Sequence, residues 1–465
     1  SAGGAITTGT QNVVIGFAAG DAITTANDNV GVGYQALTTT TTGASNVAMG
    51  TNAMNGNTTG LQNVGVGHQA LANNTTGSNN VGLGYNAGVN ITTADNNTAV
   101  GKSAGEAVTT GIQNTLIGGL AGDALTDADY NVAIGYQALT ADTLGSRSVA
   151  IGRNALLSQN FTSATESQNV AIGFAAGEQV TTGTENTFIG GEAGKATTTG
   201  TINTAVGSNA LADNTTGASN VAVGREALHA NTTASNNTAV GKHALRANTT
   251  GISNVAVGKD SGLNVTTGTD NTIVGALAAD ALTTGNTNSV FGSEAFSANV
   301  AGDRNTAIGH RALYEMNPSG NVDTLNTALG YNAGYSVTTG VQNTLIGANA
   351  GDNITTGDEN IVIGHNNHTS AVSGTNQIVM GRGVTGNANL SFCFGEASND
   401  SAIEFGATSI TAPSDERYKE NITTATAGLS FIKDLRPVTF KWKKEKDIPN
   451  TQRAYVEGSD KRVMN

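Results

Sequence analysis

The sequence predicts an all-β fold, a parallel β-solenoid (a β-roll) in which each 17-residue repeat forms one coil. A pentamer of the form Asn-Val/Thr-x-apolar-Gly recurs in 22 units, from Asn12 to a degenerate copy that opens at Gln377. All units have 17 residues except those that open at Ser148 and Asn305, which have 21. The 62 Gly residues and the frequent Thr-Thr-Gly triplets argue against helical repeats of this length, because both break helices. Two short apolar stretches and two Gly- or Asn-rich turns per unit favour stacked coils of β structure.

The first half of the unit contains nearly invariant columns. Counted from its Asn, position 1 is Asn in 20 units and position 5 is Gly in all 22. Stacked Asn side chains can hydrogen-bond amide to amide along a ladder. A Gly this regular marks a left-handed backbone or the close approach of another backbone. Position 4 is always apolar, and position 8 is Ala in 19 units, which predicts a place where nothing larger fits.

The second half supplies one large apolar side chain per coil, from either of two positions. Where position 9 is Leu, as at Leu228, position 12 is polar, as at Asn231. Where position 9 is Gly, as at Gly262, position 12 is aliphatic, as at Val265. Interiors are packed near crystal density, so one slot holds one such group. We therefore expect both positions to face the same interior pocket.

Two units break this rule. The unit at Asn186 has Gly and Thr at positions 9 and 12, which is too little volume and predicts a local soft spot. The unit at Asn305 has Leu and Met there, which is too much, and it is also one of the two long units. The extra residues of the long units, around 161–166 and 318–322, are expected to form loops pushed out of the stack.

Composition is that of a fibre, with only 5% aromatic and 12% charged residues. Only 38% of the residues are apolar, which suits a thin coil rather than a single thick core. One side of such a coil would be buried against other copies of the chain, so we expect a homotrimer. The net charge of -13 argues against nucleic acid or an anionic membrane as partner. No apolar run approaches the ~20 residues that span a membrane, so no membrane insertion is expected. The single cysteine, Cys393, excludes an intrachain disulfide framework.

The repeats and the change in composition predict three parts: a solenoid shaft over 1–390, a cap or neck over 391–413, and a small α+β domain that begins at 414 and continues to 465. Of the 22 Lys and Arg residues, 11 lie between Arg417 and Arg462, and the only Trp, Trp442, lies there too. The first eleven residues match the second half of a unit, so we expect the natural protein to continue upstream.

Two motifs near the C-terminus, SDERYKENI (Ser414 to Ile422) and LSFIKDLRPVTFKWK (Leu429 to Lys443), carry a resemblance to a known family. They resemble the C-terminal intramolecular chaperone domain of phage tail fibres and tailspikes, the endosialidase type. The resemblance implies that this domain trimerises the fibre during folding and that many members cut it off themselves. The family normally continues into a helical, coiled-coil end, so we expect only the start of the domain here.

Carried over residue by residue, the resemblance makes Ser414 the nucleophile and Lys419 the general base of a single-turnover self-cleaving Ser-Lys dyad. A Lys whose pKa is lowered by burial can activate a hydroxyl. The alternative is that Ser414 is a turn or helix-capping residue and Lys419 a solvated charge. No turnover enzyme is expected.

The repeats are similar to the head repeats of trimeric autotransporter adhesins, which also pair an Asn with a β-branched-x-Ile-Gly strand. Together the two resemblances imply a phage tail fibre: an extracellular virion component that contacts a host-surface receptor (a glycan or an outer-surface protein) and other tail proteins. A bacterial surface adhesin is the alternative, and a polysaccharide-degrading tailspike is a lesser one.

Other candidate sites have plainer explanations. Glu106 and Asp123 fall in consecutive coils, and paired carboxylates at about 5 to 10 Å can hydrolyse glycosides. A solvated solenoid face is the favoured explanation, because no insertion large enough for a substrate cleft accompanies them. His365 and His368 are the only close histidines and have no Cys or clustered acid beside them, so we expect no metal site. The Gly pattern follows the coil period, so no phosphate loop and no cofactor are expected.

Overall fold

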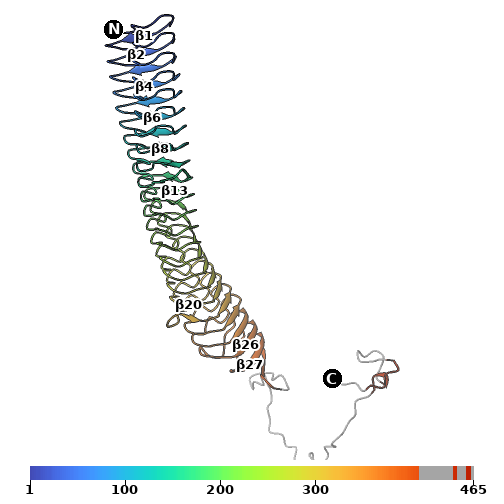
Figure 1. Ribbon diagram of the computed structural model, residues 1–465. Helices are drawn as coiled ribbons and strands as arrows, with labels where there is room; N and C mark the ends of the chain where they lie inside the picture. The colour runs from blue at the N-terminus through green and yellow to red at the C-terminus, as the bar shows by residue number, and fades with distance from the viewer. Residues whose placement is uncertain (408–443, 448–456, 462–465) are drawn as a thin grey trace, which may run out of the picture. The chain divides into compact units, whose positions relative to one another are not determined.

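The computed structural model describes residues 1–407, 444–447 and 457–461. Contacts between residues divide the chain into two units, Ser1–Ala412 and Pro413–Asn465. In the first unit, each repeat forms one coil, and the coils follow one another along the stack (Figure 1). Each coil carries one short strand at positions 2 to 4 of the repeat. No α-helix occurs among the described residues.

The three-residue strands, one per coil, are β1 (Val13–Ile15), β2 (Val30–Val32), β3 (Val47–Met49), β4 (Val64–Val66), β5 (Val81–Leu83), β6 (Thr98–Val100), β7 (Thr115–Ile117), β8 (Val132–Ile134), β10 (Val149–Ile151), β12 (Val170–Ile172), β13 (Thr187–Ile189), β14 (Thr204–Val206), β15 (Val221–Val223), β16 (Thr238–Val240), β17 (Val255–Val257), β18 (Thr272–Val274), β19 (Ser289–Phe291), β21 (Thr306–Ile308), β23 (Thr327–Leu329) and β24 (Thr344–Ile346). Longer strands close the stack: β25 (Ile361–His365), β26 (Gln377–Arg382), β27 (Ser391–Glu396) and β28 (Asn399–Glu404). Two-residue strands accompany the long units: β9 (Gly145–Ser146), β11 (Thr165–Glu166), β20 (Gly302–Asp303) and β22 (Val322–Asp323).

Neighbouring coils pair in parallel and in the register of the repeat. Val221 of β15 pairs with Thr238 of β16, and the same offset of one unit recurs from β1 to β26. All one-per-coil strands belong to one 24-stranded sheet. This confirms the predicted all-β parallel solenoid. The strand β28 pairs antiparallel with β27 and ends the described sheet.

Only the first of the two apolar stretches in each repeat is a strand. The second half of the coil is a succession of turns, and its backbone groups bond to the next coil instead. In the unit at Asn220, the amide of Leu228 donates to Ala244 O at 3.0 Å and that of Thr232 to Thr249 O at 3.1 Å. The backbone is thus hydrogen-bonded between coils on all sides, which satisfies its polar groups without a second sheet.

The Gly at position 5 is required for two reasons together. At Gly224, φ is +131°, a value that L side chains rarely adopt. A Cβ added there would also lie 2.6 Å from the carbonyl oxygen of Gly241 in the next coil. Both predicted explanations of this column are confirmed, since a left-handed backbone and a close backbone approach occur at the same residue.

The Asn at position 1 builds the expected ladder. The side-chain oxygen of Asn29 accepts from the backbone N–H of Asn46 at 2.9 Å and from its side-chain amide at 3.2 Å. The same amide of Asn46 also donates to Gly60 O at 2.9 Å. These side chains are fully buried, so the ladder satisfies polar groups that water does not reach.

Positions 9 and 12 do share one interior pocket. Leu71 at position 9 and Ile91 at position 12 of the following coil are both buried. An added Cβ on Gly88 would lie 2.9 Å from Ile91 Cδ1 and 2.9 Å from Leu71 Cδ2. The polar residues at position 12 are also inside: the buried amide of Asn74 donates to Gly77 O at 2.9 Å.

The two expected exceptions turn out differently. The predicted soft spot at the Asn186 unit is wrong, because Phe188 at position 3 fills the space. An added Cβ on Gly194 would lie 2.5 Å from the Phe188 ring. In the long unit at Asn305, Leu313 and Met316 are both fully buried, so this coil holds two large groups where the sequence rule allows one.

Where the Asn ladder is interrupted at Ser148, Gln159 from the same long unit replaces the missing amide. Gln159 Nε2 donates to Ser148 Oγ at 3.0 Å and to the Asp142 carboxylate at 2.6 Å. Gln159 Oε1 accepts from Asn169 Nδ2 at 2.9 Å, and there the ladder resumes. Burial is the main cause that raises the pKa of Asp142, and the hydrogen bond from Gln159 opposes it.

The extra residues of the two long units form parallel strand pairs beside the main sheet. β9 pairs with β11, and β20 pairs with β22. Each pair carries an ion pair at the same register: Arg147 to Glu166 at 3.1 Å, and Arg304 to Asp323 at 2.7 Å. The insertions are therefore partly ordered structure and not only loops.

In the second unit the described residues are 444–447, which include the 3-10 helix η2 (Glu445–Asp447), and 457–461. Lys444 and Lys446 lie 2.7 and 2.6 Å from the Asp460 carboxylate. Hydrogen bonds from these two ammonium groups lower the pKa of Asp460 to about 2.

Candidate functional site

The outward face of the sheet is apolar along the shaft. In each strand, position 3 points into the coil and positions 2 and 4 point outward, as the alternation of a strand requires. Position 3 is fully buried at Ala205 and Phe188, whereas position 4 is 37% exposed at Ile189. The exposed large apolar residues on this face, together called the strand face, are Val13, Ile15, Met49, Leu83, Ile117, Ile189, Val257, Phe291, Ile308, Leu329, Ile361 and Met380.

Exposed aromatic rings at position 6 add to this apolar character. Phe17 is 66% exposed and stacks on Tyr34 of the next coil, with ring centroids 5.4 Å apart. Tyr85, Tyr136 and Tyr331 in the same column are each about half exposed. The other exposed columns differ, since position 14 is mainly Thr and position 17 mainly polar. Monomeric soluble proteins rarely expose apolar patches beyond a few hundred Å², which makes the strand face the candidate interaction surface of the described residues.

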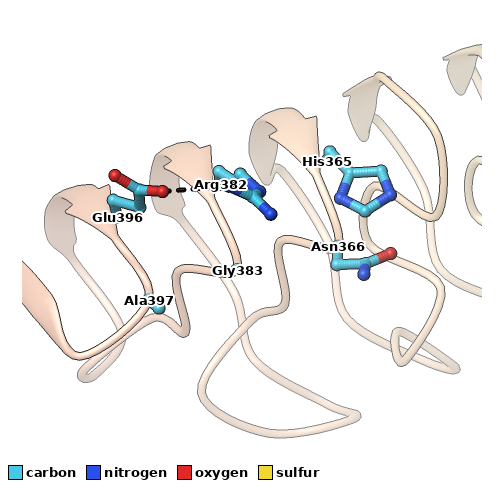
Figure 2. A pocket seen from close by; sticks show the side chains of 6 residues that line it. All are labelled: His365, Asn366, Arg382, Gly383, Glu396 and Ala397. Carbon is cyan, nitrogen blue, oxygen red and sulfur yellow. Dashed lines mark hydrogen bonds and ion pairs between the residues drawn. The ribbon is translucent and has the colours of Figure 1, made fainter.

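Position 6 also carries charged side chains in some coils, and in the last coils it lines a hollow. A hollow of about 290 Å³ is lined there by His365, Asn366, Arg382, Gly383, Glu396 and Ala397. The side chains project from the ends of three successive strands, and a dashed line joins Arg382 to Glu396, 3.0 Å apart (Figure 2). The small side chains at Gly383 and Ala397 leave the space open. All six residues are exposed, so the hollow has none of the burial that active-site chemistry uses to shift pKa values.

A network of ion pairs crosses the coils of β15 to β17. The buried carboxylate of Glu226 meets Arg225 at 2.6 Å and Arg246 at 2.8 Å. Burial alone would raise the pKa of Glu226, but the hydrogen bonds and charges of the two arginines outweigh it and lower the pKa. His243 lies 2.9 Å from Asp260 and 3.5 Å from Glu226. Each charge has an opposite partner, which is typical of a structural network.

The paired carboxylates do not form a catalytic cleft in the described structure. Glu106 and Asp123 are half-buried on the regular surface of consecutive coils. The Asp123 carboxylate accepts a hydrogen bond from Thr140, and burial is the main cause that raises its pKa. His368 lies 2.8 Å from Asp352, and His365 lines the separate hollow of Figure 2. No group of three or more His, Cys, Asp or Glu side chains that could hold a metal ion occurs within residues 1–407 or the two short described segments that follow.

Ser414 and Lys419 lie outside the described residues, so their geometry is not part of the structure. Cys393, the single cysteine, is a residue of β27, and its free thiol is buried. Within the described ranges, no helix is long and apolar enough to cross a bilayer.

Sequence reasoning singled out position 4 as apolar but did not place it on the surface. The signal that could have done so is the alternation within the pentamer. Position 3 is small or apolar throughout, whereas position 2 is Val, Thr, Ser or Ile. In a three-residue strand, positions 2 and 4 share one face, and only one face can point into the coil.

Comparison with known families finds a match for the C-terminal segment. The family model described as chaperone of endosialidase (peptidase S74) matches residues 414–455. This range contains Ser414, Lys419 and both motifs on which the resemblance rested. No curated protein matches the chain. The chain thus joins a parallel β-solenoid to a segment that matches the chaperone of endosialidase family.

Proposed function

We propose that this chain is the shaft of a homotrimeric phage tail fibre, whose C-terminal domain assists assembly of the three chains. The observation that carries the proposal is the match of residues 414–455 to the chaperone of endosialidase family, at the end of a solenoid with an apolar outer face. A domain that assists assembly acts on a chain that leaves apolar surface exposed when it is alone, and the strand face is such a surface.

Three copies can cover one another's strand faces around a common axis. Each buried Å² of apolar surface contributes about 25 cal/mol, and obligate interfaces bury roughly 2,000 Å² or more. The strand face recurs in every coil, so its contribution grows with the number of coils. The aromatic rings that some coils carry at position 6, such as Phe17 and Tyr85, would lie at the rim of this interface, where rings with one edge in water are common.

The oligomeric state tests this proposal. Light scattering of the purified chain should give the mass of three 46.6 kDa chains. The double variant Ile117→Lys with Ile189→Lys places charges on the strand face and should release monomers, because a buried unpaired ammonium is costly. The matched control is Ile202→Lys with Ile252→Lys, since both residues are exposed but lie outside the strands. A wild-type monomer, or equal dissociation of both variants, would contradict the proposal.

For the C-terminal domain, we propose that Ser414 and Lys419 form the self-cleaving dyad. Lys419, as a neutral amine, would take the proton of the Ser414 hydroxyl while Ser414 Oγ attacks the adjacent peptide carbonyl. The C–N bond at that carbonyl would then break, and Lys419 would give the proton to the departing amine nitrogen. Water would then hydrolyse the resulting ester and leave a new carboxylate and a free hydroxyl. In the expressed protein, mass spectrometry should detect cleavage beside Ser414 that Ser414→Ala and Lys419→Ala abolish. Equal cleavage of the Ser414→Ala protein would contradict the dyad.

We further propose that the assembled shaft is extracellular and serves host attachment by holding receptor-binding parts away from the virion. Binding of the purified trimer to intact host cells, competed by the unlabelled trimer, is the expected result. The similarity of the repeats to adhesin heads keeps a bacterial surface adhesin as the second candidate. Immunogold labelling distinguishes the two, because a tail fibre would be labelled on virions and an adhesin on the cells that encode it.

A further inference from the structure

We propose that a hollow beside the first long coil binds a single neutral sugar ring. The hollow measures about 180 Å³ and is lined by Asp129, Tyr130, Ser146, Arg147, Ala164, Thr165 and Glu166. Pockets for drug-sized ligands measure roughly 300–1,000 Å³, so this one has room for one small ring. The proposal goes beyond the fibre function and does not require trimerisation.

The insertion builds the hollow. Strand β11, which the extra residues supply, pairs with β9 and brings Glu166 next to Ser146. The amide of Thr165 donates to Leu144 O at 3.3 Å, and Ser167 Oγ donates to Ser146 O at 2.8 Å. The edge of the hollow is therefore tied to the neighbouring coil by hydrogen bonds to two backbone carbonyl oxygens. Binding there would cost little ordering of the protein.

The polar groups of the hollow are positioned for hydroxyl groups. Arg147 is held by Glu166 at 3.1 Å, and both side chains remain about half exposed. Asp129 Oδ1 accepts from the Ile112 amide at 2.7 Å, which fixes the carboxylate. Within the described residues, Asp129 Oδ2 accepts no hydrogen bond. Planar guanidinium and carboxylate groups can bond adjacent hydroxyls in pairs, as neighbouring hydroxyls of a pyranose require.

Tyr130 supplies the apolar surface that a sugar also needs. Its ring is 46% exposed, and the Arg147 guanidinium lies over one face of it, with Cζ 5.7 Å from the ring centroid. The face of an aromatic ring is electronegative, so the face that Arg147 leaves uncovered attracts the slightly positive C–H groups on one face of a pyranose. Tyr130 stands in the column at position 17, which is mainly polar, so repetition of the unit does not explain it.

Charge selects the kind of sugar. Two carboxylates and one guanidinium face the hollow, and the whole chain carries -13. An acidic sugar would be repelled. The hollow therefore suits neutral hexoses and N-acetylhexosamines, and it disfavours sialic and uronic acids.

The second long coil provides an internal control. It has the corresponding strand pair and the corresponding ion pair, Arg304 to Asp323. Its residues equivalent to Tyr130 and Asp129 are Thr287 and Asn286. The ring and the fixed carboxylate are thus specific to the first long coil, whereas the ion pair belongs to both.

Saturation-transfer NMR of the whole chain with glucose, galactose, N-acetylglucosamine and N-acetylneuraminic acid tests the proposal. At least one neutral sugar should show saturation transfer, and N-acetylneuraminic acid should not. Tyr130→Thr copies the residue that the second long coil already carries, so the variant should fold, and it should weaken the neutral-sugar affinity at least tenfold. Tyr130→Trp should retain binding, and Arg304→Ala should leave it unchanged.

Three results would overturn the proposal: no transfer to any neutral sugar, stronger binding of the acidic sugar, or unchanged affinity in Tyr130→Thr. Circular dichroism and the melting temperature of each variant report its folding. If Tyr130→Thr does not fold, Arg147→Ala takes its place, since Arg147 is an exposed side chain of the same hollow. Unchanged affinity in Arg147→Ala would count equally against the site.

Discussion

The shared interior pocket makes a sharp prediction about compensation between positions 9 and 12. In the coil at Asn29, Leu37 fills the pocket and Thr40 is buried beside it. The double variant Leu37→Gly with Thr40→Ile gives this coil the pattern of the natural coil at Asn80, which has Gly88 and Ile91. Both coils also have Gly at position 3, so the space to be filled is the same.

The single changes should each destabilise the coil. Leu37→Gly removes a fully buried side chain, which costs about 2–5 kcal/mol. Leu37 has a φ of +54°, and relief of this left-handed strain returns about 1–2 kcal/mol. Thr40→Ile with Leu37 still present overpacks the pocket by about 1–3 kcal/mol. The double variant should lie within ~1 kcal/mol of wild type, a favourable coupling of about 2 kcal/mol or more.

Hydrogen exchange measured on peptides spanning 29–45 reports the local opening free energy of this coil. A global unfolding curve is less suitable, because long repeat arrays do not unfold in two states. The matched control combines Leu37→Gly with Thr42→Ile, since Thr42 lies in the same coil and is exposed. The reasoning is refuted if the losses of the two single variants simply add, or if the control rescues Leu37→Gly as well.

Three further predictions follow from the coils. Gly224→Ala should destabilise its coil by more than about 2 kcal/mol in the same exchange assay, because backbone strain at φ +131° adds to the clash with Gly241 O. The control is Gly191→Ala, which should change stability by no more than about 0.5 kcal/mol, because no atom lies within 4 Å of the added Cβ. Phe188→Ala should lower the stability of the coil at Asn186 by about 3–5 kcal/mol, since the Phe188 ring fills its interior. A change in stability close to zero would instead support the soft spot that the sequence predicted. Burial raises the pKa of Asp142, so its folded coil binds the proton more tightly than the unfolded chain does. Its contribution to stability is therefore largest below the ordinary pKa of 3.8 and is lost as pH rises through the folded value. Exchange protection around residue 142, corrected for intrinsic rates, should fall as pH rises above 3.8, relative to the coil of Asn214, and a rise would contradict the assignment.

The repeat made most of the fold predictable. Columns that are identical in every coil have one environment each, so Gly224, Asn46 and the Leu228-type positions could be interpreted from the pattern alone. Where a coil departs from the pattern, the compensating residue stands in another column. Phe188 fills the coil at Asn186 from position 3, and Gln159 replaces the missing ladder amide at Ser148 from position 12.

The candidate surfaces were less predictable than the interior. An apolar column looks the same in sequence whether it packs inside the coil or against another chain, so the exposure of Ile189 and its counterparts needed the backbone. The hollow beside Tyr130 depends on the path of an insertion, which no periodic rule specifies. Ser414 and Lys419 remain predictions carried by the family match.

The offset of one unit between paired strands has a consequence for how such genes change. Every coil presents the same hydrogen-bonding edges to the coil before it and the coil after it, so the deletion or duplication of one unit rejoins edges that already fit. Unequal crossing-over between neighbouring copies can therefore lengthen or shorten the protein in steps of about 4.8 Å, the spacing of paired strands, without any further mutation.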